Sequence, residues 1–281
     1  MHLETKIYTK ENNLSFFKIL KDSFRDIYSS RFLAKQLAKR DIKAQYRQSF
    51  LGIVWAFIMP ITTALVWIFL SNSGTVQLTD TGISYPVYVF SGTLIWSIFK
   101  ETLTMPTNST NGARGILSKI NFPKEALVIS GVYKLIFNSA FKIALLIVLM
   151  LFYKVAFSWT LLLLPLGLFI IIILGIALGL ILSPISMLYT DIGKFVNLGM
   201  SFLMYVTPVV YAIPNTGVMK TIMLLNPLTY VITTTRDMLF GGDFQYLNAY
   251  IIVLVISIPI LLMGLVWYRL SIPIIVERLS A

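Results

Sequence analysis

The stretch RDIKAQYRQSFLGIVWAFIMP, residues 40–60, decides the fold of this 281-residue chain. Its first half is cationic and its second half is apolar, and no ionisable side chain occurs in residues 50–70. A helix over those residues is about 30 Å long at the usual rise, which matches the hydrocarbon core of a bilayer. Because Lys and Arg favour the cytoplasmic side, Arg40, Lys43 and Arg47 place the start of this first span there.

Composition also places the chain in a membrane. Hydrophobic residues make up 57% of it and charged residues 12%, whereas soluble domains carry about 25% charged residues. The net charge is +11, but most of the 23 Lys and Arg residues fall in segments that we assign to the cytoplasm. The positive-inside rule therefore explains the basic balance, and we expect no nucleic-acid partner. Cysteine is absent and the one histidine is His2, so we expect neither disulfides nor a metal site.

The hydropathy pattern predicts an all-α polytopic membrane protein with six transmembrane helices and both termini in the cytoplasm. Pro184 should end the fourth span, Pro208 should kink the fifth, and Gly175 and Gly179 should allow close helix contact. A long polar and amphipathic segment precedes the first span, so we expect no cleavable signal peptide. The chain divides into an N-terminal region at 1–49, a transmembrane domain at 50–270 and a tail at 271–281. The predicted spans are 50–70, 85–103, 126–152, 159–182, 195–213 and 249–270.

Two polar segments also have helical patterns. In residues 15–28, apolar positions such as Phe17 and Phe24 recur at steps of three and four among charged residues. Such a helix lies in the headgroup plane or packs against protein, and periodicity leaves both interpretations open. A second helical stretch begins at Arg31. The polar cytoplasmic segment 106–125 contains helix formers for one or two turns at 112–119.

Residues 214–248 are too polar for a simple span and too apolar for an ordinary loop. We expect two short helices, 219–225 and 228–240, with a break at Asn226-Pro227 and an end at Gly241. They should form a re-entrant pair in the outer leaflet, because non-helical backbone at that depth must be buried in protein or face water.

The third predicted span carries the most informative polar pattern. Ser130, Lys134, Asn138 and Lys142 are four residues apart and form a stripe on one helix face. Each ammonium group costs about 2.5–3.5 kcal/mol near the bilayer centre, and this span has no acidic residue. Either the stripe faces an aqueous pathway for an anionic substrate such as a lipid pyrophosphate, or Lys134 snorkels and only Lys142 is unusual. Hydropathy does not give the rotation of the helix, so both remain open.

Aromatic residues within the predicted spans are further candidates for the substrate pathway. Sugar rings present C–H faces that pack on aromatic rings, although helix packing is the alternative role for each residue. The candidates are Tyr88, Trp96, Tyr205 and Tyr211.

Several kinds of chemistry have no sequence support. No Walker A motif occurs, so ATP and Mg²⁺ would be bound by a separate subunit. Glu101, near the inner end of the second span, is the only acid within a predicted span, which disfavours a proton- or sodium-coupled transporter. The lack of a usable His or Cys and the few outer carboxylates disfavour a membrane enzyme.

Residues 40–60 resemble the start of the first membrane helix in type 2 ABC transporter permeases, especially those that export lipid-linked polysaccharides and teichoic acids. The resemblance continues in order through YTDIGK at 189–194, TPVVY at 207–211 and NPLTY at 226–230, which Arg236-Asp237 follows. Thr190 departs from the pattern, because the family is expected to carry Arg before the Asp.

The resemblance implies the permease subunit of an ATP-driven exporter in the bacterial inner membrane. It implies a homodimer joined to two copies of an ABC ATPase, with a lipid-linked glycan such as O-antigen, or a polyol-phosphate polymer such as teichoic acid, as cargo. A small-molecule or lipid exporter and a membrane enzyme of envelope glycan synthesis are the alternatives. The implied residues are Arg114, Gly115 and Lys119 for ATPase coupling, Phe17, Phe24, Arg40 and Arg47 for a cytoplasmic gate, and Asn226, Pro227 and Arg236 for the re-entrant pair.

Overall fold

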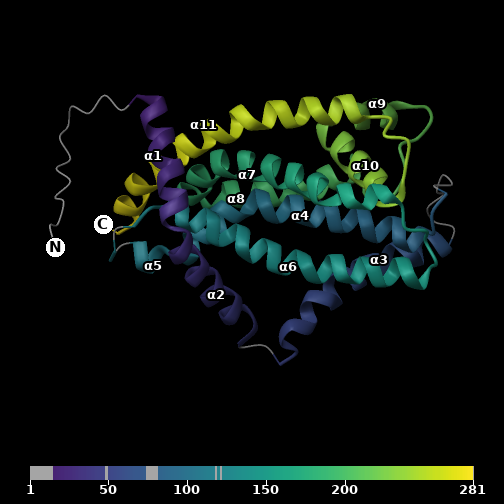
Figure 1. Ribbon diagram of the computed structural model, residues 1–281, viewed down its shortest axis with the longest axis horizontal. Helices are drawn as coiled ribbons and strands as arrows, with labels where there is room; N and C mark the ends of the chain where they lie inside the picture. The colour runs from purple at the N-terminus through teal and green to yellow at the C-terminus, as the bar shows by residue number, and fades with distance from the viewer. Residues whose placement is uncertain (1–14, 48–49, 74–81, 118, 121, 281) are drawn as a thin grey trace.

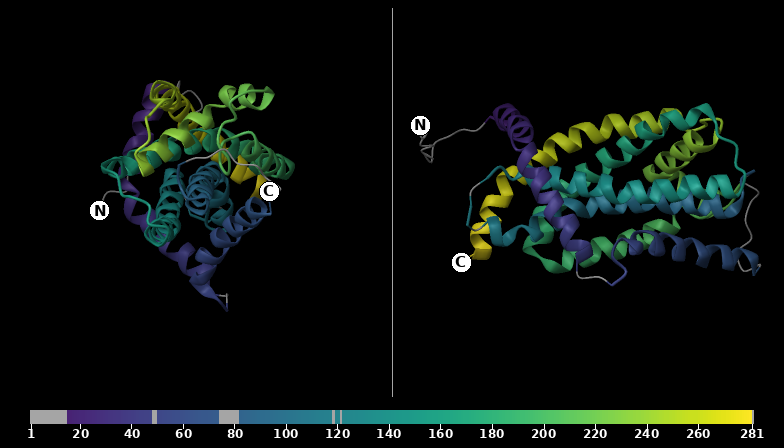
Figure 2. Two further views of the ribbon diagram at one scale, coloured as in Figure 1. Left: turned by 90° about the vertical axis from the view of Figure 1, so that its right-hand side faces the viewer. Right: turned by 60° about the horizontal axis from the view of Figure 1, so that its bottom comes forward.

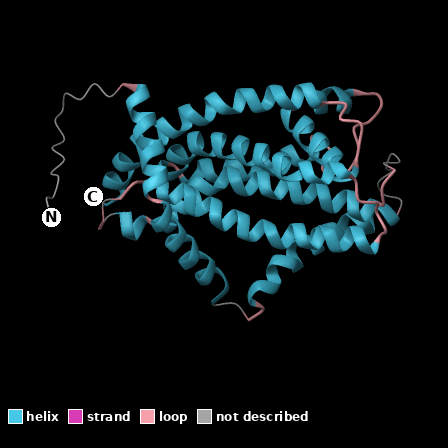
Figure 3. Ribbon diagram, viewed as in Figure 1, coloured by secondary structure: helices cyan, strands magenta, loops and turns pink. Residues whose placement is uncertain are grey.

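The computed structural model describes residues 15–47, 50–73, 82–117, 119–120 and 122–280, and this part of the chain is helical without a β-strand (Figure 3). Four long helices run along the molecule (Figure 1). They are α4 (Tyr85–Gly112), α6 (Glu125–Phe152), α7 (Leu164–Leu188) and α11 (Leu247–Ser280). Helix α7 packs against both α4 and α11, and α6 packs on α4. The main core is formed by α4, α7 and the short helix α10 (Pro227–Phe240), with smaller contributions from α6 and α11.

Four described segments are long and apolar enough to cross a membrane, namely Gly52–Leu70, Glu125–Phe152, Trp159–Leu188 and Leu247–Arg278. They match the first, third, fourth and sixth predicted spans. The second predicted span lies within α4, and the fifth begins within α8 (Thr190–Tyr205). These two helices are not among the four apolar segments, because polar residues lower the mean hydropathy of α4 and because α8 is short.

The N-terminal helices lie outside this bundle. Helix α1 (Phe16–Ser29) crosses the ends of the long helices at a steep angle, and α2 (Arg31–Arg47) leads away from them (Figures 1 and 2). After a 3-10 turn, η1 (Gly52–Val54), helix α3 (Trp55–Asn72) returns toward the bundle. Helix α2 contacts α6, while α3 contacts α4 and α6. The structure confirms both helices predicted before the first span.

Two helices continue through prolines beyond their predicted spans. Helix α4 extends beyond residue 103 through the buried Pro106 to Gly112, and α7 continues through the buried Pro184 to Leu188. The prediction that Pro184 ends the helix of the fourth span was therefore wrong. Packing of α4 between α6 and α7 outweighs the one backbone hydrogen bond that a helical proline lacks. The connection after α4 contains one helical turn, α5 (Arg114–Leu117), as predicted.

The fifth span also differs from its prediction. Helix α8 ends at Tyr205, and the backbone around Pro208 is not helical, so a kinked helix over 195–213 was wrong. The ring of a proline disfavours the helical conformation in the residue before it. Side chains of the next helices bind the backbone here instead: Asn226 donates to the Val206 carbonyl at 3.2 Å and Arg236 to the Pro208 carbonyl at 3.0 Å.

The last helix is longer than predicted. The sequence placed its end at residue 270 and a separate tail at 271–281, but α11 is helical to Ser280. Tyr268, Ile272 and Ile275 are buried against residues of α4, α6 and α7. This packing extends the helix beyond the length that a bilayer alone would require.

The predicted pair of short helices is confirmed as α9 (Val218–Leu225) and α10 (Pro227–Phe240). The Asn226 side chain accepts a hydrogen bond from the Leu228 amide at 3.0 Å and so caps α10. Gly241 ends that helix with φ of 77°, which glycine adopts without strain. The pair lies at the end of the bundle opposite the chain termini (Figure 1).

The glycines of α7 set the distance between α7 and α4. A Cβ on Gly179 would overlap the Leu103 carbonyl oxygen, and one on Gly175 would overlap the Thr102 side chain. The predicted close contact at these two glycines is confirmed.

We therefore expect Gly179→Ala to force α4 and α7 apart and to lower the thermal unfolding midpoint of the detergent-solubilised protein. Overpacking of this kind costs about 1–3 kcal/mol. Gly112→Ala is the matched control, because a Cβ there meets no atom within 4 Å. Equal midpoints for the two variants would contradict this account of the helix contact.

Candidate functional site

A polar groove lies between α2, α3, α4 and α6. It consists of two adjoining cavities of about 260 and 490 Å³ that share Gln45, Glu101 and Asn138 among their lining residues. Ser130 and Lys134 line the smaller cavity, and Lys142 lines the larger. The structure therefore brings the whole predicted stripe of α6 to one groove.

Helix α4 contributes a second polar stripe on the opposite side of the groove. Ser97, Glu101, Thr104 and Asn108 follow one another at steps of four, three and four residues, and each lines one or both cavities. This stripe was not predicted from the sequence, because it begins in the second predicted span and continues beyond the predicted end of that span at residue 103.

The charge of Lys142 is compensated by side chains of α4. Its side chain is buried, and its ammonium group forms an ion pair with the Glu101 carboxylate and donates to Ser97 Oγ at 3.1 Å. The sequence offered no partner because the acid belongs to another span, 41 residues away in the chain. Lys134 is half-buried and has no ion pair among the residues that the structure describes.

The end of α2 divides the groove. The Tyr46 hydroxyl donates to Asn138 Oδ1 at 3.3 Å, which links α2 to the stripe of α6 between the two cavities. Burial, and secondly the Glu101 carboxylate, raises the pKa of Tyr46, so this phenol stays neutral and keeps its proton. Asp41 lines the smaller cavity and pairs with Arg40 at 2.7 Å, while Arg47 is exposed at the end of α2.

The structure separates the four candidate aromatics. Trp96 lines the larger cavity. Tyr88 instead lies under Arg236, whose guanidinium is 3.8 Å from the centroid of its ring. The Tyr211 hydroxyl donates to the carbonyl of Tyr205, the last residue of α8. These two tyrosines are not among the residues that line the groove.

Arg236 fixes α10 to the bundle. It is 5% exposed and donates to the carbonyls of Pro208 and Val209 at 3.0 and 2.7 Å. With Asn226, it satisfies the non-helical backbone after α8. Pro227 occupies the first turn of α10, where its missing amide proton is harmless. The three residues expected to mark this helix pair thus stabilise its junction with the bundle.

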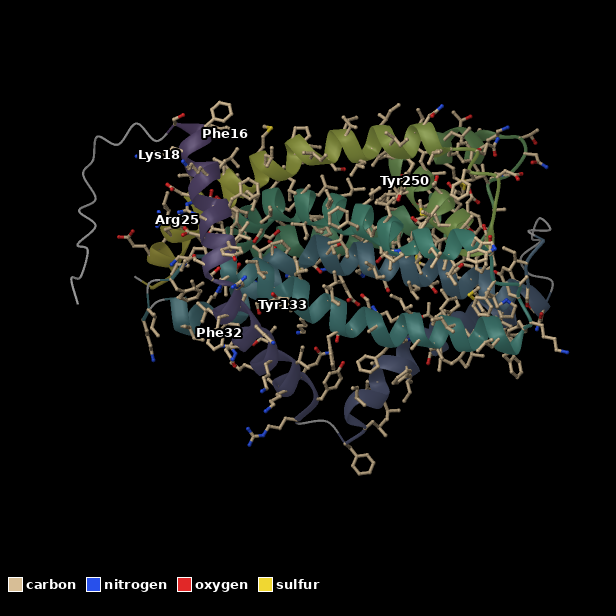
Figure 4. All side chains as sticks on the ribbon, viewed as in Figure 1. Phe16, Lys18, Arg25, Phe32, Tyr133 and Tyr250 are labelled. Carbon is tan, nitrogen blue, oxygen red and sulfur yellow. The ribbon has the colours of Figure 1, made fainter. Side chains whose placement is uncertain are left out.

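Helix α1 combines the two interpretations that its periodicity left open. Ile19 and Leu20 pack against Leu262 and Val266 of α11. Phe17 and Phe24 are exposed on another face. Figure 4 labels Phe16, Lys18 and Arg25 of the same helix. One face of α1 therefore packs on protein, and its exposed aromatic face suits a membrane interface.

A charged network joins α1 to the bundle. Arg269 of α11 pairs with Asp26 of α1 at 2.7 Å and with the buried Glu125 of α6 at 2.5 Å. Next to it, the Tyr268 hydroxyl is 2.6 Å from Thr110 Oγ1 of α4. The sequence analysis did not predict these contacts, since their residues lie far apart in the chain.

The turn α5 has one buried side and one exposed side. Ala113 and Leu117 pack with Leu37 of α2 and Leu127 of α6. The expected coupling residues Arg114, Gly115 and Lys119 are all exposed. A partner that displaces this turn would therefore push directly on α2. The described residues contain no cluster of three His, Asp or Glu side chains that could hold a metal ion.

Comparison with known proteins identifies the family of this chain. Residues 33–240, which include the groove and α10, match the family model of the ABC-2 type transporter. The chain is 28% identical over 219 residues to the O-antigen export system permease protein RfbA of Myxococcus xanthus, covering 77% of this chain and 83% of that one. It is 26% identical over 218 residues to the protein of the same name from Klebsiella pneumoniae, covering 75% and 81% respectively. The chain belongs to the ABC-2 type transporter family.

Proposed function

We propose that the chain is the permease subunit of an ABC exporter that moves a lipid-linked polysaccharide of the O-antigen type across the bacterial inner membrane. The polar groove carries this proposal: two facing polar stripes, one of which contains Lys134 and Lys142, line a groove in a largely apolar helix bundle together with Lys100. The family and the names of the relatives support the same reading. ATP and Mg²⁺ bind to a separate ATPase.

The groove favours a cargo that carries both hydroxyl groups and negative charge. Its amide and hydroxyl side chains suit sugars, and its lysines suit the phosphate of a lipid-linked headgroup. A teichoic acid, whose polymer contains phosphate, is the second candidate cargo. A neutral small molecule fits these cations less well. An enzyme is disfavoured because Glu101 and Asp41 are both held in ion pairs.

The complete topology has six spans, with α4 and α8 as the second and fifth and both termini in the cytoplasm. The chain termini and α5 lie at the same end of the molecule, which supports this orientation (Figure 1). Helices α9 and α10 form a re-entrant pair in the outer leaflet. In the membrane, non-helical backbone beside such a pair must form its hydrogen bonds with the protein. Asn226 and Arg236 donate these hydrogen bonds to the backbone carbonyls after α8.

The functional unit is a homodimer with two ATPase subunits. None of the described side chains in the apolar window of α3 is buried within the chain, and Met200 is the buried residue of α8. Both helices expose polar groups, namely Thr62 on α3 and Asn197 and Ser201 on α8. A second copy of the chain covers these groups better than lipid does.

Deletion of the gene in its host tests the function directly. We expect the lipid-linked polymer to accumulate inside the cell and to disappear from the surface, and the chain supplied in trans with its ATPase to restore export. Normal surface polysaccharide in the deletion strain would exclude this cargo.

The exposed side of α5 should bind the ATPase. Charge reversal at both Arg114 and Lys119 should weaken co-purification of the ATPase or uncouple ATP hydrolysis from export, because Arg114 is exposed on this turn and Lys119 is exposed just after it. Lys220→Glu on α9, at the other end of the bundle, serves as the control. Unchanged assembly and export in the double variant would refute the assignment of this surface.

The lysines of α6 should act on the anionic part of the cargo. In the Lys134→Met/Lys142→Met variant the length of the side chains is kept and the charge is lost, so we expect the protein to fold. Stimulation of the ATPase by the lipid-linked polymer should fall about tenfold or more, since a hydrogen bond to a charged group contributes roughly 1.5–3 kcal/mol. Arg at both positions should retain more activity than Met. Export at the original rate in the double Met variant would show that the stripe is structural.

A further inference from the structure

We propose that Glu101 is a built-in counter-ion, which holds Lys142 until the anionic headgroup of the cargo displaces it. The identity of the cargo rests on the proposed function. The exchange itself is inferred from the charges and the exposure of side chains in the polar groove.

The charges that line the groove do not balance. Lys100, Lys134 and Lys142 line it together with the carboxylates of Asp41 and Glu101. Asp41 is paired with Arg40, and Glu101 with Lys142. Lys100 and Lys134 have no ion pair within the described ranges of the chain, so two positive charges remain. A group with two negative charges, such as a phosphate monoester or a pyrophosphate, would neutralise them.

The two partners of the buried ion pair differ in their access to water. The side chain of Lys142 is 11% exposed, whereas that of Glu101 is 38% exposed. A buried ammonium group without a partner is strongly unfavourable, but a carboxylate with this exposure can be hydrated. Lys142 therefore needs an anion at all times, and Glu101 can be replaced as that anion.

The cavities place an incoming anion beside this pair. The larger cavity, about 490 Å³, has the size of an ordinary ligand site and is lined by Lys100, Glu101 and Lys142. Lys134 lines the adjoining cavity and lies eight residues earlier on α6, about 12 Å along the helix axis. The headgroup thus meets Lys134 first, from the end of the bundle that carries the termini, and then Lys100 and Lys142.

The exchange explains how a cationic groove can also release its cargo. When the headgroup binds, Ser97 Oγ remains as the second partner of Lys142, and Glu101 turns to water. When the headgroup leaves, Glu101 pairs with Lys142 again, and Lys142 is no longer available to bind an anion. Since transport requires binding that is reversible, the carboxylate limits the affinity for the anion.

The test is a binding measurement on the permease–ATPase complex in phosphatidylcholine nanodiscs. The probes are undecaprenyl pyrophosphate, the neutral undecaprenol and free inorganic pyrophosphate. The variants are Glu101→Gln, Lys142→Met and the double variant, with Glu277→Gln as control because this exposed carboxylate lies at the far end of α11. The thermal unfolding midpoint is measured with and without each probe.

Glu101→Gln should bind undecaprenyl pyrophosphate roughly 5- to 150-fold more tightly than the original protein, the range usual for two coupled equilibria. Without the probe its unfolding midpoint should be lower, and the probe should raise that midpoint more than it does for the original protein. Lys142→Met should bind more weakly, and the double variant should behave like Lys142→Met. The headgroup on its lipid should bind more tightly than inorganic pyrophosphate, and Glu277→Gln should bind like the original protein.

A purely structural ion pair gives a different pattern. In that case Glu101→Gln destabilises the protein without tighter binding, and this result would overturn the proposal. Equal binding of undecaprenol would overturn it as well, because recognition would then not involve charge. If neither the original protein nor Glu101→Gln binds undecaprenyl pyrophosphate while the gene still supports export in its host, the counter-ion proposal fails and the proposed function stands.

Discussion

Inside a bilayer, polar groups must find their partners within the protein, and the rest of this structure depends on how three buried or half-buried cations meet that constraint. Arg269 binds Asp26 and Glu125, Lys142 binds Glu101, and Arg236 binds backbone carbonyls. Each cation joins helices that are distant in the sequence. These contacts add to the close packing of apolar side chains and help to fix the relative positions of the helices.

The exposure of the partners separates structural contacts from exchangeable ones. The side chain of Glu125 is 3% exposed, so its pair with Arg269 is a permanent link between α6 and α11. Arg236 is satisfied by carbonyls, which cannot move away without unfolding the turn after α8. The partly hydrated Glu101 is different, because its ion pair opens into a cavity that a ligand can occupy. The proposed exchange of anions therefore belongs to this contact and not to the other two.

Helix α2 connects the proposed ATPase surface to the groove. At one end Leu37 packs with the buried side of the turn α5, and at the other Tyr46 contacts Asn138 between the two cavities. A movement of α5 that is driven by the ATPase would therefore shift the residue that divides the groove. The Arg269 network holds α1 against α6 and α11 beside it, so the movement would be borne by α2.

The sequence by itself determined the helical membrane class, the apolar spans, the pair of short helices with its break at Asn226-Pro227, and the stripe of Lys134 and Lys142. These features are local, because hydropathy, helical spacing and capping act within one segment. Only the tertiary structure decided where α4, α7 and α11 end, since packing with neighbouring helices carried them through prolines or beyond the bilayer length. It alone also paired Lys142 with Glu101 and Arg236 with the turn after α8. The rotation of each helix sets these contacts, and rotation depends on the packing of residues that are far apart in the chain.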